Sequence, residues 1–451
     1  MKRRSYLTTS AIAMSAFAGC FSDDPAQRSQ DEEGVGDDTV DEESDVADDG
    51  EDVEEDDSDD GDSDDDGDDE SADEEPGLLG TFDDFEDLGR WEILAGRFEA
   101  DAERAYEGTQ SVRLRASASE DQVRIRRPLP EPIDVREVAP ALALATDDAA
   151  NPVIQLQDAS GDFFQFKQHV REGHPFVRRN FGHTAVGGDP DLSAITEIQV
   201  IDWSGDQERE FWIDDLHFVP RITEARVLIQ FQGGFESDYT LAYPILEEYG
   251  LSASTFLATD RIRPDASMAG DRLTEAQVAE LVDAGWSLGT VGARHQHLHQ
   301  VEPERLESDL LSPLSWFAER GYHDAQYFAF PGGRFDQRML DIVGEHYDLG
   351  FAGRHRAQAY ATNPLTVTRI SGGVDRRNLT AEQMIDAIDW TARYGGLTTI
   401  TFYEMDDEDA AALEETAAHL SALVAAGEIE LTTPAEIATE FVYRGDDGTT
   451  R

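Results

Sequence analysis

The chain has 451 residues, of which 97 are acidic and 36 are basic, and its formal net charge is −61. This length is sufficient for two or three domains at roughly 100–200 residues each. A charge this negative excludes nucleic acid as a partner, because the phosphates of the nucleic acid would be repelled.

The N-terminus has the pattern of an export signal. Basic residues precede a short apolar run, and small residues precede Cys20, the only cysteine in the chain. Arg3–Leu7 resembles a twin-arginine signal and Phe17–Cys20 resembles a lipobox. The apolar run is too short to span a bilayer. We expect residues 1–20 to be the signal and Cys20 to be lipidated, which anchors the exported protein to the outer face of the cytoplasmic membrane. A thiol in a discarded signal peptide is the alternative.

Residues 21–76 contain 31 Asp or Glu and one basic residue, Arg28. Such a segment has almost no apolar side chains with which to form a core, so we expect residues 21–77 to be a disordered acidic tether. The rest of the chain is acidic as well. This is typical of proteins adapted to high salt, where a screening length of about 3 Å at molar salt removes the self-repulsion. A surface that binds cationic polymers is the alternative.

Residues 78–221 have the pattern of an antiparallel β-sandwich. Short runs alternate between apolar and polar residues, and Gly, Pro, Asp or Asn bound each of them. No helix longer than a turn or two is evident. Runs of this kind at this spacing are typical of a sandwich. The predicted strands include residues 111–115, 122–126, 153–157 and 211–213.

The two ends of this domain resemble a galactose-binding-type jelly roll, through residues 85–93, 105–114 and 211–219. Modules of that type often bind carbohydrate, and the resemblance implies a structural calcium near the first hairpin. Hard oxygen ligands for calcium could come from Asp83, Asp84, Glu86, Asp214 and Asp215; solvated carboxylates are the alternative. Candidate aromatic residues for stacking on sugars, with the sandwich core as the alternative, are Trp91, Phe163, Phe164, Phe181 and Trp203.

Residues 222–445 alternate between strand and helix patterns. The first unit, residues 225–257, contains a strand, a turn at Gly233 and Gly234, a helix closed by Gly250, and a second strand. Repeated units of this kind favour a parallel (β/α) barrel, followed by a tail at residues 446–451. Further strands are expected at 286–291, 326–330, 349–352, 366–370 and 397–403, and helices at 274–284, 303–320, 337–346, 381–391, 409–425 and 434–441.

Several motifs lie in a fixed order along this domain. They are Phe231-Gln232-Gly233-Gly234, the strand at 251–257, residues 286–290, Phe328–Gly333 with the sequence FAFPGG, and Leu431–Thr433. In this order they resemble the motifs of polysaccharide deacetylases, the NodB-like family. The resemblance implies an irregular parallel (β/α) barrel of the NodB-like type, which follows the predicted jelly-roll sandwich.

The resemblance also implies where the chemistry of the family would lie. In the family, one Asp and two His hold a divalent metal that activates water, a second Asp is the base, and a late His is the acid. Carried over position by position, only the second metal-binding histidine, His295, is present. The base becomes Gln232, the metal-binding Asp becomes Gly233, the first metal-binding His becomes Val291 and the acid becomes Tyr403.

A rebuilt metal site is the alternative to this loss. His295, His297 and His299 alternate, so a strand-like loop could place them on one side to bind a zinc-like ion. Histidines in a surface loop are the simpler interpretation. Replacement bases could be Glu236, Asp238 or Glu404, although each is equally well explained as a surface or helix-terminal carboxylate.

These observations favour an exported lipoprotein that binds cell-surface or extracellular polysaccharide without catalysis. Its expected binding residues are Gln232, Tyr403, Arg294, Pro331 and Arg334. The second hypothesis is an active metal-dependent N- or O-deacetylase with a relocated site. A structural role in the cell envelope is the third.

Overall fold

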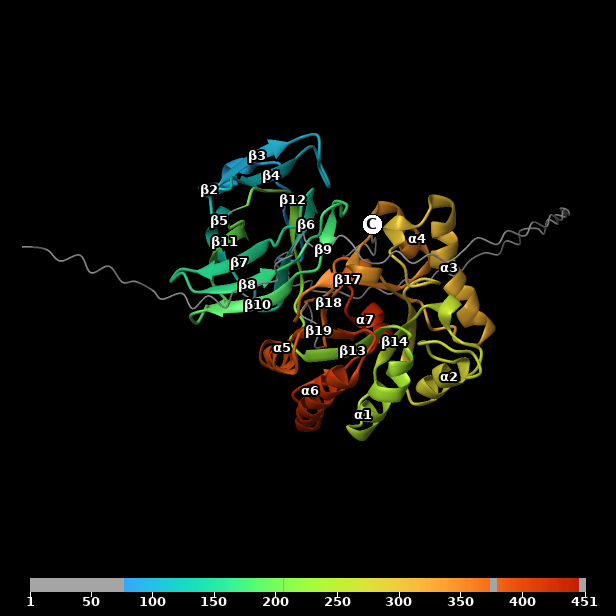
Figure 1. The fold of residues 1–451 in the computed structure, drawn as a ribbon. Helices are drawn as coiled ribbons and strands as arrows, with labels where there is room; N and C mark the ends of the chain where they lie inside the picture. The colour runs from blue at the N-terminus through green and yellow to red at the C-terminus, as the bar shows by residue number, and fades with distance from the viewer. Residues whose placement is uncertain (1–76, 206, 374–378, 446–451) are drawn as a thin grey trace, which may run out of the picture. The chain divides into compact units, whose positions relative to one another are not determined.

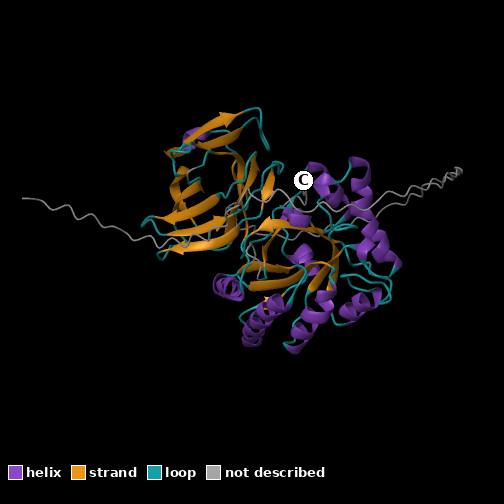
Figure 2. Ribbon diagram, in the orientation of Figure 1, coloured by secondary structure: helices purple, strands orange, loops and turns teal. Residues whose placement is uncertain are grey.

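The computed structural model describes residues 77–205, 207–373 and 379–445. The predicted signal with Cys20, the tether up to residue 76 and the tail at 446–451 lie outside the described residues. The described residues belong to one compact unit, residues 76–451. It contains a domain of strands and loops, followed by a domain in which helices surround the strands (Figures 1 and 2). No helix of the described part of the chain is long and apolar enough to span a bilayer.

The first domain is an antiparallel β-sandwich, as predicted. Its two sheets have the orders β3-β4-β12-β6-β9, with β1 beside β12, and β10-β8-β7-β11-β5-β2. Alternate residues such as Val112, Leu114, Val123 and Ile125 are buried between the sheets, which explains the period-two pattern. The strands are β1 Gly80–Asp83, β2 Glu92–Ala95, β3 Arg97–Asp101, β4 Ser111–Ala116, β5 Gln122–Ile133, β6 Val138–Thr146, β7 Val153–Asp158, β8 Phe163–Lys167, β9 Val177–Arg179, β10 Gly182–Gly187, β11 Ile195–Trp203 and β12 Arg209–Pro220.

The structure does not gather the acids of the predicted calcium site. Asp83 is buried and paired with Arg127, and Asp215 is buried with its Oδ2 atom 2.6 Å from Arg178 Nε. Asp84 is exposed, and its Oδ1 atom accepts a hydrogen bond from the N–H of Glu86. Among the described residues no group of three or more His, Cys, Asp or Glu could hold a metal ion. The two buried carboxylates thus balance the charges of arginines of the sandwich, and a calcium ion near the first hairpin stays a prediction.

Most of the candidate sugar-stacking aromatics are part of the core. Trp91, Phe164 and Phe181 are buried, which favours the alternative interpretation for these three. Phe163 is half-buried, and Trp203 is 49% exposed at the end of β11. Only Trp203 among the five is therefore freely available to a ligand.

The second domain is a closed parallel barrel of seven strands, as predicted. The order is β14-β15-β16-β17-β18-β19-β13, and pairing of β13 with β14 closes it, while β20 extends from β13. The strands are β13 Ala225–Gly233, β14 Ser254–Leu257, β15 Ser287–Thr290, β16 Tyr327–Ala329, β17 Leu349–Arg354, β18 Val367–Ser371, β19 Gly396–Phe402 and β20 Glu430–Leu431. The helices are α1 Tyr243–Glu248, α2 Glu275–Asp283, α3 Pro303–Glu319, α4 Gln337–His346, α5 Ala381–Tyr394, α6 Asp407–Ala426 and α7 Pro434–Glu440.

The side chains of β13 alternate between the two faces of the barrel wall. Val227, Ile229 and Phe231 pack in the layer shared with the surrounding helices, whereas Leu228 belongs to the inner cluster. By the same alternation Gln232 faces inward, one residue before the end of β13. Because all seven strands are parallel, their carboxyl ends meet at one end of the barrel.

The sandwich and the barrel are joined by specific hydrogen bonds. Asn180 Nδ2 donates to the Asn363 carbonyl oxygen at 2.8 Å, and the Asn363 N–H donates to Asn180 Oδ1 at 3.1 Å. Trp390 Nε1 donates to His183 Nδ1 at 3.1 Å. Experiments on the barrel are therefore best made with the whole protein, because an isolated barrel would leave these buried groups without partners.

Candidate functional site

The carboxyl end of the barrel brings the positions of the family resemblance together. Gln232 and Gly233 end β13, and the pairing of Phe231 with Phe402 places Tyr403 beside them. His295 follows β15 and Pro331 follows β16 at the same end. The positions that the family resemblance singles out therefore lie together at one end of the barrel.

Gln232, at the position of the base, is bound to an arginine that the sequence analysis did not single out. Arg369, on β18, donates from Nη1 to Gln232 Oε1 at 2.8 Å and from Nη2 to the Phe330 carbonyl oxygen at 2.7 Å. Gln232 is 1% exposed and Arg369 is 5% exposed. Burial lowers the pKa of Arg369, which still keeps its proton because arginine titrates far above neutral pH. A buried cation thus faces a neutral amide.

At the position of the metal-binding Asp, the space for a side chain is filled. Gly233 has a φ of 119°, and a Cβ added there would lie 2.4 Å from Phe235 Cε2 and 3.1 Å from His295 Cε1. Phe235 itself is buried. The retained histidine is therefore in place beside Gly233, but an aromatic ring occupies the position of the missing carboxylate.

An arginine stacks on that ring. Arg272 Cζ lies 3.5 Å from the centroid of the Phe235 ring, a cation–π contact. His295 is half-buried beside them, with a left-handed backbone (φ 52°). Burial, and then the positive charges of Arg272, Arg261, His297 and Arg369, lower the pKa of His295 to about 4. The imidazole is thus neutral at pH 7 and surrounded by cationic groups.

The position of the first metal-binding histidine is apolar. Val291 is completely buried in the inner cluster with Leu228, Phe256 and Ala258. Its N–H donates to the Leu257 carbonyl oxygen at 3.1 Å, so the backbone is held in the barrel wall.

Tyr403, at the position of the acid, is half-buried, and its hydroxyl lies 3.4 Å from Ser371 Oγ. Tyr403 is close enough to Arg369 for its electrostatic interaction to raise the pKa of the guanidinium, against the larger lowering by burial. Its hydroxyl at the rim can donate a hydrogen bond to a ligand.

The histidines of the rebuilt-site hypothesis are not assembled as metal ligands. His297 and His299 are exposed, with their ring centroids 5.6 Å apart, and within residues 77–205, 207–373 and 379–445 no set of three or more suitable ligands occurs. The backbone of the loop is left-handed at His295, and a site of three histidines stays a prediction.

The candidate replacement bases have other partners. Glu236 pairs with Arg263 at 2.7 Å, and the buried Asp238 accepts a hydrogen bond from Thr255 Oγ1 at 2.8 Å. Burial raises the pKa of Asp238 to about 7. Glu404 is exposed at the start of the loop after β19.

The other predicted binding residues line the outer rim. Arg294 Nε lies 3.3 Å from Asp260 Oδ2, and Arg334 Nη1 lies 3.9 Å from Glu172, which belongs to the sandwich. Both arginines are partly exposed. Pro331 is buried at the start of its loop. The two arginines are therefore accessible, but each has a carboxylate nearby.

The divalent metal that the family implies does not fit this site. The position of one ligand is filled by Phe235, that of another is the apolar Val291, and the remaining histidine is surrounded by arginines. Cationic neighbours raise the free energy of a bound divalent cation. We therefore assign no chemical step to a metal.

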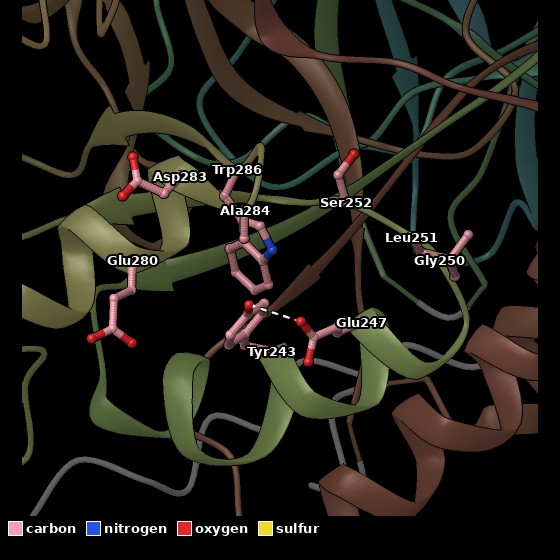
Figure 3. A pocket seen from close by; sticks show the side chains of 9 residues that line it. All are labelled: Tyr243, Glu247, Gly250, Leu251, Ser252, Glu280, Asp283, Ala284 and Trp286. Atoms are coloured by element: carbon pink, nitrogen blue, oxygen red, sulfur yellow. Dashed lines mark hydrogen bonds between the residues drawn. The ribbon is translucent and has the colours of Figure 1, made fainter.

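A hollow of about 630 Å³ lies at the opposite end of the barrel (Figure 3). Its lining includes residues that lie just before β14 and β15 in the chain, and none of the predicted site residues. Its lining combines Tyr243 and Trp286 with the acids Glu247, Glu280 and Asp283. The Tyr243 hydroxyl donates to Glu247 at 3.1 Å, so part of this polar surface is already satisfied internally.

Comparisons with known proteins agree with the place of this site. Residues 221–347 match the family model described as "Polysaccharide deacetylase". A Bacillus subtilis (strain 168) protein named "Putative polysaccharide deacetylase YxkH" is 27% identical over 129 residues, which is 28% of this chain and 44% of that protein. The match thus spans less than half of that relative.

Two solved structures are similar over the same part of the chain. The deacetylase PplD of Streptococcus pyogenes, in complex with acetate, is 22% identical with a TM-score of 0.32, over 36% of this chain and 69% of that one. A family 4 carbohydrate esterase from Streptomyces lividans, in complex with acetate, is 16% identical with a TM-score of 0.33, over 47% and 94% of the two chains.

Proposed function

We propose that this protein is an exported lipoprotein whose polysaccharide deacetylase domain binds polysaccharide without catalysing deacetylation. The observation that carries the proposal is the filled metal position, where the Phe235 ring, on which Arg272 stacks, occupies the space beside Gly233. Hydrolysis of an acetamide needs an activated water and a base. Gln232 cannot act as that base, because an amide does not accept a proton near neutral pH.

Retention of the fold supports a binding role. The barrel closes, its motif loops meet at one end, and residues that can donate hydrogen bonds remain at the rim, including Tyr403, Arg294 and Arg334. Such groups suit the hydroxyls and carboxylates of a sugar chain. The polysaccharide is expected outside the cell, because the signal and lipobox patterns direct the chain there.

Metal content and acetate release test the loss of catalysis. We expect the purified full-length protein, in molar KCl with zinc, cobalt or nickel, to hold no stoichiometric metal. We expect it to release no acetate from N- or O-acetylated polysaccharides above a protein-free control. An active deacetylase assayed in the same salt is the positive control. Metal-dependent release that disappears in His295→Ala would instead establish a relocated site.

The anchor is tested with Cys20. The full-length protein made in a host that lipidates exported proteins is expected to partition into the detergent phase, and the Cys20→Ser variant into the aqueous phase. Equal partitioning of the two proteins would refute lipidation at this residue and leave the binding function unaffected.

A further inference from the structure

Among the described residues, the buried guanidinium of Arg369 has only neutral hydrogen-bond partners. Its two hydrogen bonds go to an amide oxygen and a carbonyl oxygen, and among the described residues no carboxylate forms an ion pair with it. The side chain is 5% exposed. A buried charge without a counter-charge is costly, because it loses hydration that neutral acceptors replace only in part. An anion at this position would lower that cost.

Two further donors beside it lack acceptors. Gln232 Nε2 is buried and has no hydrogen-bond partner, and the same is true of Arg272 Nε. Each orphaned donor costs roughly 1–3 kcal/mol relative to a satisfied one. Both residues lie around the same point, since Gly233, next to Gln232, approaches His295 and the Phe235 ring on which Arg272 stacks. The site thus presents unsatisfied donors where the family holds a cation.

Of the three arginines around the site, two have no paired carboxylate among the described residues. Arg272 Nη1 pairs with Asp271 at 2.9 Å, and the charges of Glu404 and Asp238 also act on Arg272. Arg261 is exposed, and no carboxylate of the described residues is paired with it. Arg369 lacks such a pair as well. In a chain with a net charge of −61, this local excess is opposite in sign to the protein as a whole.

We propose that the carboxyl end of the barrel binds an anionic polysaccharide, with a carboxylate or sulfate group of the sugar chain accepting hydrogen bonds from Arg369, Gln232 and Arg272. This inference rests on the proposed binding function and names its ligand class. A guanidinium with a planar pair of donors suits both kinds of anion. Because Arg369 and Gln232 are almost fully buried, only the anionic substituent reaches them, and the sugar ring lies against the half-buried His295 and Tyr403.

The test compares ligands that differ in charge. The full-length protein is titrated with alginate, which carries carboxylates, with dextran sulfate, and with uncharged dextran, in about 0.1 M and about 2 M KCl. We expect the protein to bind one of the two polyanions and not dextran. Which polyanion binds will show whether the site recognises a carboxylate or a sulfate group. Binding is expected to persist at the higher salt, because salt screens buried charges less than exposed ones.

A nearly isosteric variant makes the test specific for the site. Gln232→Glu keeps the shape but places a carboxylate against Arg369, so the site carries its own anion. We expect polyanion affinity to fall on the order of 10- to 100-fold, the loss of a charged hydrogen bond. Its thermal stability should be unchanged or higher, because Arg369 gains a counter-charge. Arg261→Gln, at an exposed position, should weaken polyanion binding less than Gln232→Glu does and should leave the fold unchanged.

The control is Arg393→Gln, which makes the same change of charge at the exposed end of α5, away from the carboxyl ends of the strands. It should bind as the wild type does. Equal binding of dextran and polyanions would overturn the anion inference and leave the proposed function standing. Unchanged polyanion affinity in a folded Gln232→Glu variant would also overturn it. If no glycan binds, both proposals fail.

Discussion

Replacing Gly233 with aspartate, the residue that the family resemblance places there, is expected to lower the free energy of unfolding by about 2–6 kcal/mol. The backbone at this position has a φ of 119°, which side chains other than hydrogen adopt only with strain. The new Cβ would also lie 2.4 Å from Phe235 Cε2, so the ring would have to move. Chemical or thermal unfolding of the purified protein measures the loss.

The double variant Gly233→Asp/Phe235→Ala separates the two causes. Removing the ring frees space for the aspartate, so the cost of the Gly233 change should be smaller in this background than in the wild type. The strain of the backbone should remain. A single variant as stable as the wild type would show that the loop at Gly233 has room for a carboxylate, and would reopen the metal site.

Introducing the second missing ligand should be comparably costly. Val291→His is expected to destabilise the protein by about 2–6 kcal/mol at pH 7, because a larger ring with polar nitrogens enters a fully buried apolar cluster. The loss should grow below about pH 6.5 by up to about 1.4 kcal/mol per pH unit, since the unfolded chain then binds a proton that the buried imidazole does not. Unfolding curves at pH 7 and pH 5 measure both effects.

Val291→Leu is the matched control, because it adds volume without a polar or titratable group. It should be less destabilising than Val291→His and should show no added pH dependence. Equal stability of the histidine variant and the wild type at both pH values would contradict the apolar surroundings of Val291. Because both lost ligands have been replaced by packing, restoring the family residues alone is not sufficient to recover a metal site.

Much of this protein could be predicted from local patterns. Alternation of apolar residues gave the sandwich strands, and strand–helix repeats gave the barrel, because these periods follow from backbone geometry within a few residues. The helix predicted at 274–284 corresponds to α2, which begins after a capping box formed by Thr274 and Gln277. The same reasoning placed Gln232, His295, Pro331 and Tyr403 at one end of the barrel, since parallel strands share their carboxyl ends.

The chemistry of the site was predicted less well, and the reason is distance along the chain. Arg369 contacts Gln232 only because the barrel closes, which joins residues 137 positions apart. Its one signal in the sequence is a charged residue within a predicted strand. The buried ion pairs of Asp83 and Asp215 were missed for the related reason that spacing does not reveal which arginine contacts each carboxylate.

The sequence by itself thus determined the order of the elements, the position of the site and the loss of the family's ligands, because each of these depends on residue identity and local period. Only the tertiary structure decided what replaced the lost groups. Phe235 fills the space beside Gly233, Arg272 stacks on that ring, and Arg369 is buried against an amide. Burial and charge balance depend on the packed site as a whole. They are the reason why we propose an anion, and not a metal ion, as its ligand.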